Sequence, residues 1–188
     1  MKTALVYCRD RSRSALHTAG EDAARSAAAC ALTIERDALG KPYGRAADGA
    51  PVSLSISHAF PFCFAAASAE KDVALGADVE RIRMFSRTTS DAFLTVSEKK
   101  IVACAPAEKR DELRTLAWSL KESALKALGC GLRQHPQTID VSGALRAPDT
   151  GRGFVTVRGR SAAAAWRRIG REHIATTVVL PDLCAYHA

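Results

Sequence analysis

The hydrophobic pattern of the first 80 residues is mostly that of β-strands, with one helical stretch between them. Residues 20–32 have the spacing of an amphipathic helix with acidic residues in the first turn. Residues 40–51, rich in Gly, Pro and polar side chains, predict a loop. The predicted strands are residues 3–8, 32–36, 52–57, 62–68 and 71–80. The short connections between the last three strands predict an antiparallel meander.

From residue 86 onward the helical period returns, and strands follow it. We expect a short helical turn at residues 90–93, a helix at residues 97–104 capped by Ser97, and a long helix at residues 108–128 that stops at Gly129. Four candidate strands come after it, at residues 138–141, 153–158, 164–168 and 173–180. The order strands, helix, strands predicts an α+β fold and not regular βαβ units.

Length and composition indicate one globular domain with a basic surface. No linker interrupts the chain, so we expect a single domain over residues 1–188. The net charge of +7 favours anionic partners, which include nucleic acid, a phosphorylated cofactor and an acidic protein; a basic solvated surface is the ordinary alternative. The six cysteines lack zinc-ribbon or thioredoxin spacing. With no signal peptide and no membrane-spanning run, we expect a reducing cytoplasm.

Two carboxylates stand at the end of the strand predicted over residues 71–80. Asp78 and Glu80 are two residues apart, so both point to one face, with the small Gly76 before them. Converging carboxylates repel each other unless a cation lies between them, and Mg²⁺ prefers oxygen ligands. The alternative is an exposed acidic strand end that pairs with Arg81 or Arg83.

The long helix carries charges where an apolar stripe is expected. Glu122 and Lys126 are four residues apart and share a face with Trp118. Alone, this pattern is typical of an ordinary amphipathic helix with one ion pair. Charges on an inward face, however, require a partner or a role.

Ser57-His58 ends the first strand of the predicted meander, where a hydroxyl and an imidazole can bind phosphate oxygens. A structural histidine is the alternative. Gly40-Lys41-Pro42 precedes it and is also compatible with a simple turn. The chain contains no phosphate-binding P-loop, no dinucleotide fingerprint, no nucleophile elbow and no zinc-protease motif.

Taken together, these residues resemble the pattern of the 4'-phosphopantetheinyl transferase superfamily, clearly over about residues 21–131. The matching motifs are Gly40-Lys41-Pro42, Ser57-His58, Gly76-Ala77-Asp78-Val79-Glu80, Phe93 with Glu98, and Trp118-Ser119-Leu120-Lys121-Glu122-Ser123-Ala124-Leu125-Lys126 followed by Gly129 and Gly131. The spacing from Phe93 to Glu98 is one residue longer than in the family pattern. Each motif alone is modest, whereas five in order are specific.

The resemblance implies a fold of two similar half-units related by a pseudo-twofold, each with antiparallel strands and one long helix. The expected halves are residues 1–83 and 86–188, with coenzyme A in the cleft between them. The motif order resembles the larger, surfactin-synthetase-activating monomeric type, here with a short N-terminal half.

The resemblance also implies roles for the charged residues. Asp78, Glu80 and Glu122 would hold Mg²⁺, and Lys126 would neutralise charge on the phosphates. The general base would be Glu122 or a water bound to the metal.

For coenzyme A, the resemblance implies that Lys41 and Pro42 lie near the adenine and that Ser57 and His58 bind phosphate. The candidates for binding the 3'-phosphate are Arg11, Arg13 and Arg25, of which Arg25 is the first choice.

The implied reaction is transfer of 4'-phosphopantetheine from coenzyme A to a serine of an acidic apo acyl or peptidyl carrier protein. It would release adenosine 3',5'-bisphosphate and need neither nucleic acid nor membrane. Two alternatives stay open: a non-catalytic coenzyme A-binding relative and a basic nucleic-acid-binding protein, whose binding would weaken steeply with salt.

Overall fold

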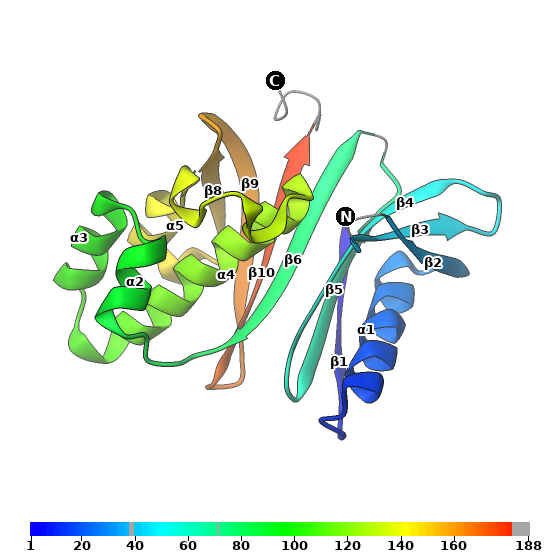
Figure 1. Cartoon of the computed structure of the whole chain (residues 1–188), viewed down its shortest axis with the longest axis horizontal. Helices are drawn as coiled ribbons and strands as arrows, with labels where there is room; N and C mark the ends of the chain where they lie inside the picture. Colours follow the sequence, from blue (N-terminus) through cyan, green and yellow to red (C-terminus); the bar gives the residue numbers. More distant parts are fainter. Residues whose placement is uncertain (38–39, 71, 182–188) are drawn as a thin grey trace.

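The computed structural model describes residues 1–37, 40–70 and 72–181 and consists of two five-stranded antiparallel sheets with helices packed on them (Figure 1). The strand orders are β1-β5-β4-β3-β2 and β6-β10-β9-β8-β7. In both sheets the first strand therefore pairs with the last, and the others follow in reverse order. This shared connectivity confirms the predicted α+β fold of two similar half-units.

The first half is built on an alanine-rich core. Its elements are β1 (Lys2–Tyr7), α1 (Arg13–Ala28), β2 (Leu32–Arg36), β3 (Pro42–Ala46), β4 (Pro51–Ala59) and β5 (Phe62–Ser68). On α1, Ala23, Ala24 and Ala27 are buried against Val52 and Leu54 of β4. Small side chains let the helix lie close to the sheet, but each buries little apolar area.

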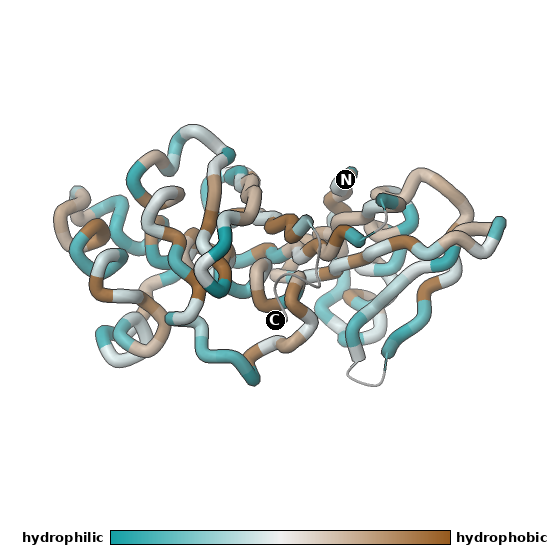
Figure 2. The backbone as a smooth tube through the Cα atoms, turned by 90° about the horizontal axis from the view of Figure 1, so that it is seen from above, coloured by the Kyte–Doolittle hydropathy of each residue, from teal (hydrophilic) through white to brown (hydrophobic). Residues whose placement is uncertain are grey.

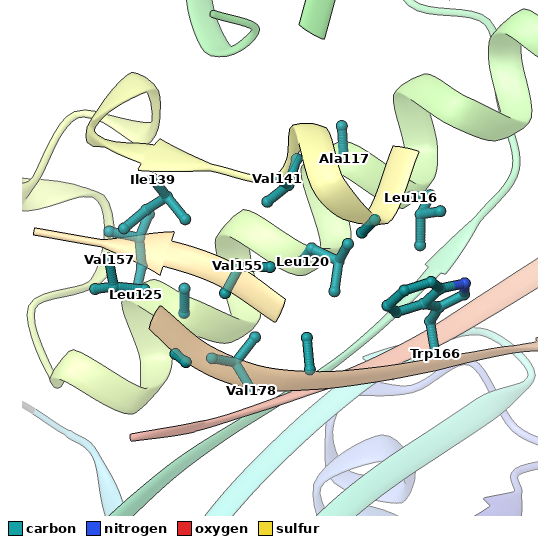
Figure 3. Packing of buried hydrophobic residues seen from close by; sticks show 14 of the residues in the cluster. Leu116, Ala117, Leu120, Leu125, Ile139, Val141, Val155, Val157, Trp166 and Val178 are labelled. Carbon is teal, nitrogen blue, oxygen red and sulfur yellow. The ribbon is translucent and has the colours of Figure 1, made fainter. Parts of the chain in front are cut away.

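The second half has the larger core. Its elements are β6 (Val73–Arg81), α2 (Arg87–Phe93), α3 (Val96–Cys104), η1 (Ala107–Lys109), α4 (Arg110–Leu128), η2 (Gly131–Arg133), η3 (Pro136–Thr138), β7 (Ile139–Asp140), α5 (Ser142–Arg146), η4 (Pro148–Thr150), β8 (Arg152–Val157), β9 (Arg160–Ile169) and β10 (His173–Pro181). Figure 3 shows side chains of α4, among them Leu120, packed with Val155 and Val178 of the sheet. Burial of large aliphatic side chains makes this half the main source of hydrophobic stabilisation.

The two halves meet along β6, and Figure 2 shows them side by side along the long axis. Leu75, Ala77 and Val79 of β6 pack against Phe64 and Ala66 of β5. These residues alternate with Gly76, Asp78 and Glu80, so the apolar face of β6 opposite the carboxylates forms the contact between the halves.

Serine side chains of β4 bind the backbone of β6. The Ser53 hydroxyl donates to the Val73 carbonyl at 2.8 Å, and the Ser55 hydroxyl accepts from the Ala77 N–H at 2.8 Å. The serine face of β4 therefore does not face solvent: its hydroxyls satisfy the backbone groups of β6, the edge strand of the second sheet.

The meander prediction is wrong in its third strand, because β6 pairs with β10 and not with β5. By strand pairing the chain changes sheets between β5 and β6, earlier than the expected division near residues 83–86. Sequence alternation indicates a strand but not its partner. The proposed strand start at residue 71 lies outside the described residues.

Other local predictions also differ from the structure. Helix α1 begins seven residues early, capped by Ser12, and Gly20 lies inside it, where a Cβ would be 2.9 Å from the Ile56 side chain. A glycine used for close packing thus resembled a helix boundary. Helix α3 is capped by Thr95, not Ser97, in a capping box. The predicted loop contains β3, where pairing with two neighbours outweighs weak strand propensity. Helix α5 was not predicted.

Candidate functional site

The site begins with the close packing of α4 on β6 at Gly76. A Cβ added at Gly76 would lie 1.8 Å from the Ser123 carbonyl oxygen and 2.7 Å from the Ala127 nitrogen, both backbone atoms of α4. Any side chain here would push the helix away. The glycine therefore brings one face of α4 against the strand that carries Asp78 and Glu80.

Asp78 is the buried centre of the site, with 3% of its surface exposed. Its Oδ1 accepts from the Lys126 ammonium at 2.7 Å and from the Ser57 hydroxyl at 2.7 Å. Its Oδ2 accepts from the Ser119 hydroxyl at 2.8 Å. Helix α4 and the first half thus both contribute hydrogen-bond donors to the one carboxylate that β6 carries.

Lys126 makes three contacts, all directed inward. Besides Asp78, its ammonium donates to the Ser57 hydroxyl at 3.0 Å and to the Ala77 carbonyl at 3.3 Å. These contacts can take all three of its protons. Lys126 also lies at the edge of the cleft described below.

Two further carboxylates flank Asp78. Glu80 accepts from the Trp118 indole N–H at 3.0 Å, and Trp118 packs edge-on against Phe93, with ring centroids 5.2 Å apart. Burial raises the pKa of Glu80, the charge of Asp78 raises it further, and the Trp118 hydrogen bond lowers it. The two family motifs on β6 and α4 are therefore in direct contact.

Glu122 is half-buried on the same face of α4. It makes no hydrogen bond or ion pair with any residue in the described part of the chain. Burial raises its pKa, the charge of Asp78 acts in the same direction, and Lys126 lowers it. A carboxylate with a raised pKa is a stronger base than an ordinary glutamate.

The donor chemistry of the three carboxylates fits a hard divalent cation. The Lys126 ammonium at Asp78 Oδ1 already shows that this oxygen accepts a cation. Among residues 1–37, 40–70 and 72–181, however, no group of three His, Cys, Asp or Glu side chains converges closely enough to hold a metal. Binding of Mg²⁺ by all three would therefore require side-chain movement.

A cleft of about 770 Å³ adjoins these residues and is lined by both halves. Four predicted binding residues line it: Lys41, Pro42, His58 and Lys126. Ser57 is next to it, with its hydroxyl bound to Asp78.

The cleft is also lined by basic residues other than Arg25, the first choice from the sequence for binding the 3'-phosphate. His17, Arg36 and Arg133 line it, together with Arg13, one of the weaker candidates. Arg36 lies 3.1 Å from the His17 imidazole. These residues come from α1, from the end of β2 and from η2, so only the fold brings them together.

The structure does not bring Arg25 to this cleft. Arg25 pairs with Glu21 at 3.1 Å and with Asp22 at 3.5 Å on α1. Arg11 lies over the Phe60 ring at 4.4 Å and is likewise not a lining residue. Both arginines have other contacts that explain their positions.

Lys41 connects the first half to the end of α4. Its ammonium donates to the Ala127 carbonyl at 3.2 Å, in the last turn of the helix. A cation is favourable there because the final helix carbonyls carry partial negative charge. Burial lowers the pKa of Lys41.

Lys121, the motif residue before Glu122, is not a lining residue of the cleft and has a structural environment. Its ammonium lies 3.0 Å from Glu98, and both side chains are fully buried. Glu98 also accepts from the Val141 and Thr95 N–H groups, at 2.8 Å each. The motif residue Glu98 is thus the partner of Lys121.

Sequence reasoning missed the buried hydroxyls of Ser119, Ser123 and Thr176. One signal was available: Ser119 and Ser123 share the helix face of Glu122 and Lys126, at spacings of three and four residues. Thr176 comes from β10, and its place beside them depends on the pairing of β10 with β6.

A comparison with protein-family models agrees with the motifs. The family model described as 4'-phosphopantetheinyl transferase superfamily matches residues 74–178. No curated protein matches the chain. Among solved structures, Thermotoga maritima holo-[acyl-carrier-protein] synthase matches with 21% identity and a TM-score of 0.39, covering 57% of this chain and 63% of that one. Among the described residues, no helix is long and apolar enough to cross a bilayer. The family model covers more than half of the sequence, and the chain therefore belongs to the 4'-phosphopantetheinyl transferase superfamily.

Proposed function

We propose that the chain transfers the 4'-phosphopantetheine group of coenzyme A to a serine of an apo acyl or peptidyl carrier protein. The observation that carries this proposal is the contact of Asp78 with Lys126 at the edge of a basic cleft, with Glu80 and Glu122 beside it. Family membership supports phosphopantetheinyl transfer in general, and these residues supply the groups that such a transfer requires.

In the proposed reaction, the serine hydroxyl oxygen forms a bond to the phosphorus that carries pantetheine. The bond from that phosphorus to the bridging oxygen of the pyrophosphate breaks, and adenosine 3',5'-bisphosphate leaves. Glu122 accepts the serine proton, a role that its raised pKa favours. Lys126 stabilises negative charge on the phosphate oxygens, after its ammonium leaves Asp78.

In this proposal, Asp78, Glu80 and Glu122 are the residues that would bind Mg²⁺. When bound there, Mg²⁺ would supply charge neutralisation at the pyrophosphate. The chain's own part is to pack the α4 segment that carries Glu122 against the β6 segment that carries Asp78 and Glu80, through the close contact at Gly76 and the hydrogen bond from Trp118 to Glu80.

Coenzyme A would occupy the cleft between the halves. Its three phosphate groups are anionic, which fits the basic lining of Lys41, His58, Arg36 and Arg133. We assign the 3'-phosphate to the Arg36 and His17 side of the cleft, in place of Arg25. Pro42 offers an apolar surface for the adenine.

The carrier protein is expected to be acidic, because a chain with a net charge of +7 attracts acidic partners. We expect a monomer, since one chain supplies both walls of the cleft. We also expect a cytoplasmic protein.

The test is transfer itself. The chain, Mg²⁺, coenzyme A and a panel of apo carrier proteins are incubated, and intact mass reports addition of phosphopantetheine. Glu122→Gln should lower turnover about 10²- to 10⁴-fold. The matched control is Glu112→Gln on the same helix, which pairs with Lys109 and Arg168 and should retain full turnover.

Each outcome decides between the hypotheses. Lack of transfer to every carrier, with coenzyme A still bound, would favour the non-catalytic relative. Full turnover by Glu122→Gln would mean that another group accepts the proton.

A further inference from the structure

A buried cluster of hydroxyls lies behind Asp78, on the side away from Lys126. Ser119 and Ser123 of α4 are fully buried, and Thr176 of β10 is 1% exposed. The Thr176 Oγ1 lies 2.9 Å from the Ser119 Oγ and 2.7 Å from the Ser123 Oγ. The motifs on β6 and α4 assign no role to these three side chains.

The protons of this cluster can be placed by counting donors. An ionised carboxylate only accepts, so the single Ser119 hydroxyl proton goes to Asp78 Oδ2, at 2.8 Å. Thr176 then donates toward Ser119, whose carbonyl lies 2.9 Å from its Oγ1. Ser123 in turn donates to Thr176. The Ser119 proton therefore ends on Asp78, while Thr176 donates to the Ser119 carbonyl and Ser123 donates to Thr176.

The hydrogen bond from Ser119, the only one of the three hydroxyls that contacts Asp78, fixes the rotation of the carboxylate. Because Ser119 holds Oδ2 on the buried side, Oδ1 points to Ser57 and Lys126. The Lys126 ammonium, 2.7 Å away, marks Oδ1 as the oxygen that faces a cation. Without Ser119, Asp78 could rotate and present its oxygens differently.

We propose that Ser119 is a positioning residue, which holds Asp78 in the orientation needed to bind the divalent cation. The inference rests on the proposed function, because it takes Asp78 as a ligand of Mg²⁺. Groups that orient metal ligands typically change metal affinity 10- to 100-fold when they are removed. Ser119 acts through Asp78 and touches neither coenzyme A nor the carrier protein.

The experiment measures Mn²⁺ binding, as a substitute for Mg²⁺, by the paramagnetic resonance signal of free Mn²⁺, with neither coenzyme A nor carrier protein present. Ser119→Ala should weaken binding about 10-fold or more. Ser123→Ala is the matched control, since it removes an equally buried hydroxyl from the same helix but none that contacts Asp78. It should stay within about twofold of the unmodified chain, and Ser119→Thr, which keeps the hydroxyl, should restore binding.

Turnover gives the second measurement. With Ser119→Ala, the Mg²⁺ concentration for half-maximal rate should rise by a similar factor, while the rate at saturating Mg²⁺ is kept. A purely structural serine would lower the rate at every Mg²⁺ concentration.

The outcomes separate this inference from the proposed function. Equal Mn²⁺ binding by the two alanine variants overturns the role of Ser119 alone. No Mn²⁺ binding by the unmodified chain overturns the metal assignment of Asp78, and the role of Ser119 with it. If Ser119→Ala does not fold, Ser119→Cys takes its place, because a thiol is a much weaker donor than a hydroxyl: weaker Mn²⁺ binding supports the inference, and unchanged binding overturns it.

Discussion

Helix α4 carries two lysine–carboxylate pairs that differ in almost every property except their chemistry. Lys121 with Glu98 is fully buried, whereas Lys126 with Asp78 leaves 29% of the lysine side chain exposed. Lysines five positions apart project about 140° apart around a helix, so one points toward α3 and the other toward β6.

The surroundings of the two pairs differ as well. Lys121 also donates to the Pro136 and Ile139 carbonyls, so its partners are fixed parts of the second half. Lys126 is shared between the halves through Ser57, and it borders the cleft. The charge of Lys121 thus stabilises the fold of the second half, whereas the charge of Lys126 is accessible from the cleft.

The largest expected effect tests the buried pair. Glu98→Gln leaves the Lys121 ammonium buried without its counter-charge, and the free energy of unfolding should fall by about 3 to 5 kcal/mol. Urea denaturation measures this loss. Adding Lys121→Met should recover part of it, because the unpaired charge is then gone. A loss below about 1 kcal/mol in the single variant would contradict a structural role.

Lys126→Met should have the opposite profile. Lys126→Met removes the counter-charge of the buried Asp78, but Asp78 keeps its hydrogen bonds from Ser57 and Ser119, so the loss of stability should be smaller than that of Glu98→Gln. Turnover should fall on the order of 100-fold, because a cation is lost from the transition state. Transfer assays and urea denaturation are read together. A stability loss as large as that of Glu98→Gln would remove the distinction between the two pairs.

A smaller effect shows how far the functional region extends into the first half. Arg36→Ala should weaken coenzyme A binding about 10-fold, because one charge-assisted hydrogen bond is lost. Arg25→Ala is the control, and calorimetric titration should show unchanged affinity, since Arg25 pairs with Glu21 outside the cleft. The reverse result would restore the assignment made from the sequence.

The smallest expected effect is a pH dependence of the free energy of unfolding, caused by the two glutamates near Lys126. Folding raises the pKa of Glu80 and Glu122, mainly through burial, so the folded chain binds more protons than the unfolded chain just above the ordinary glutamate pKa. Stability should therefore fall as pH rises through that window.

Denaturation between about pH 4 and pH 7 measures this slope. Glu122→Gln should reduce it. A slope of the opposite sign would mean that other carboxylates dominate.

Sequence by itself determined the family and most of the helices and strands. Two of the five motifs contain Asp78, Glu80, Glu122 and Lys126. The structure brings Asp78 and Lys126 into contact, with the two glutamates close enough for the charge of Asp78 to raise their pKa. This succeeded because alternation in a strand and i,i+4 spacing in a helix are local properties, which sequence order fixes directly.

Only the tertiary structure decided which elements are neighbours. The pairing of β6 with β10, the buried partner of Lys121 and the basic wall with Arg36 all join residues far apart in the chain. Such contacts depend on how two sheets and α4 pack, and Gly76 shows the reason: its missing side chain is explained only by the helix backbone that lies against it.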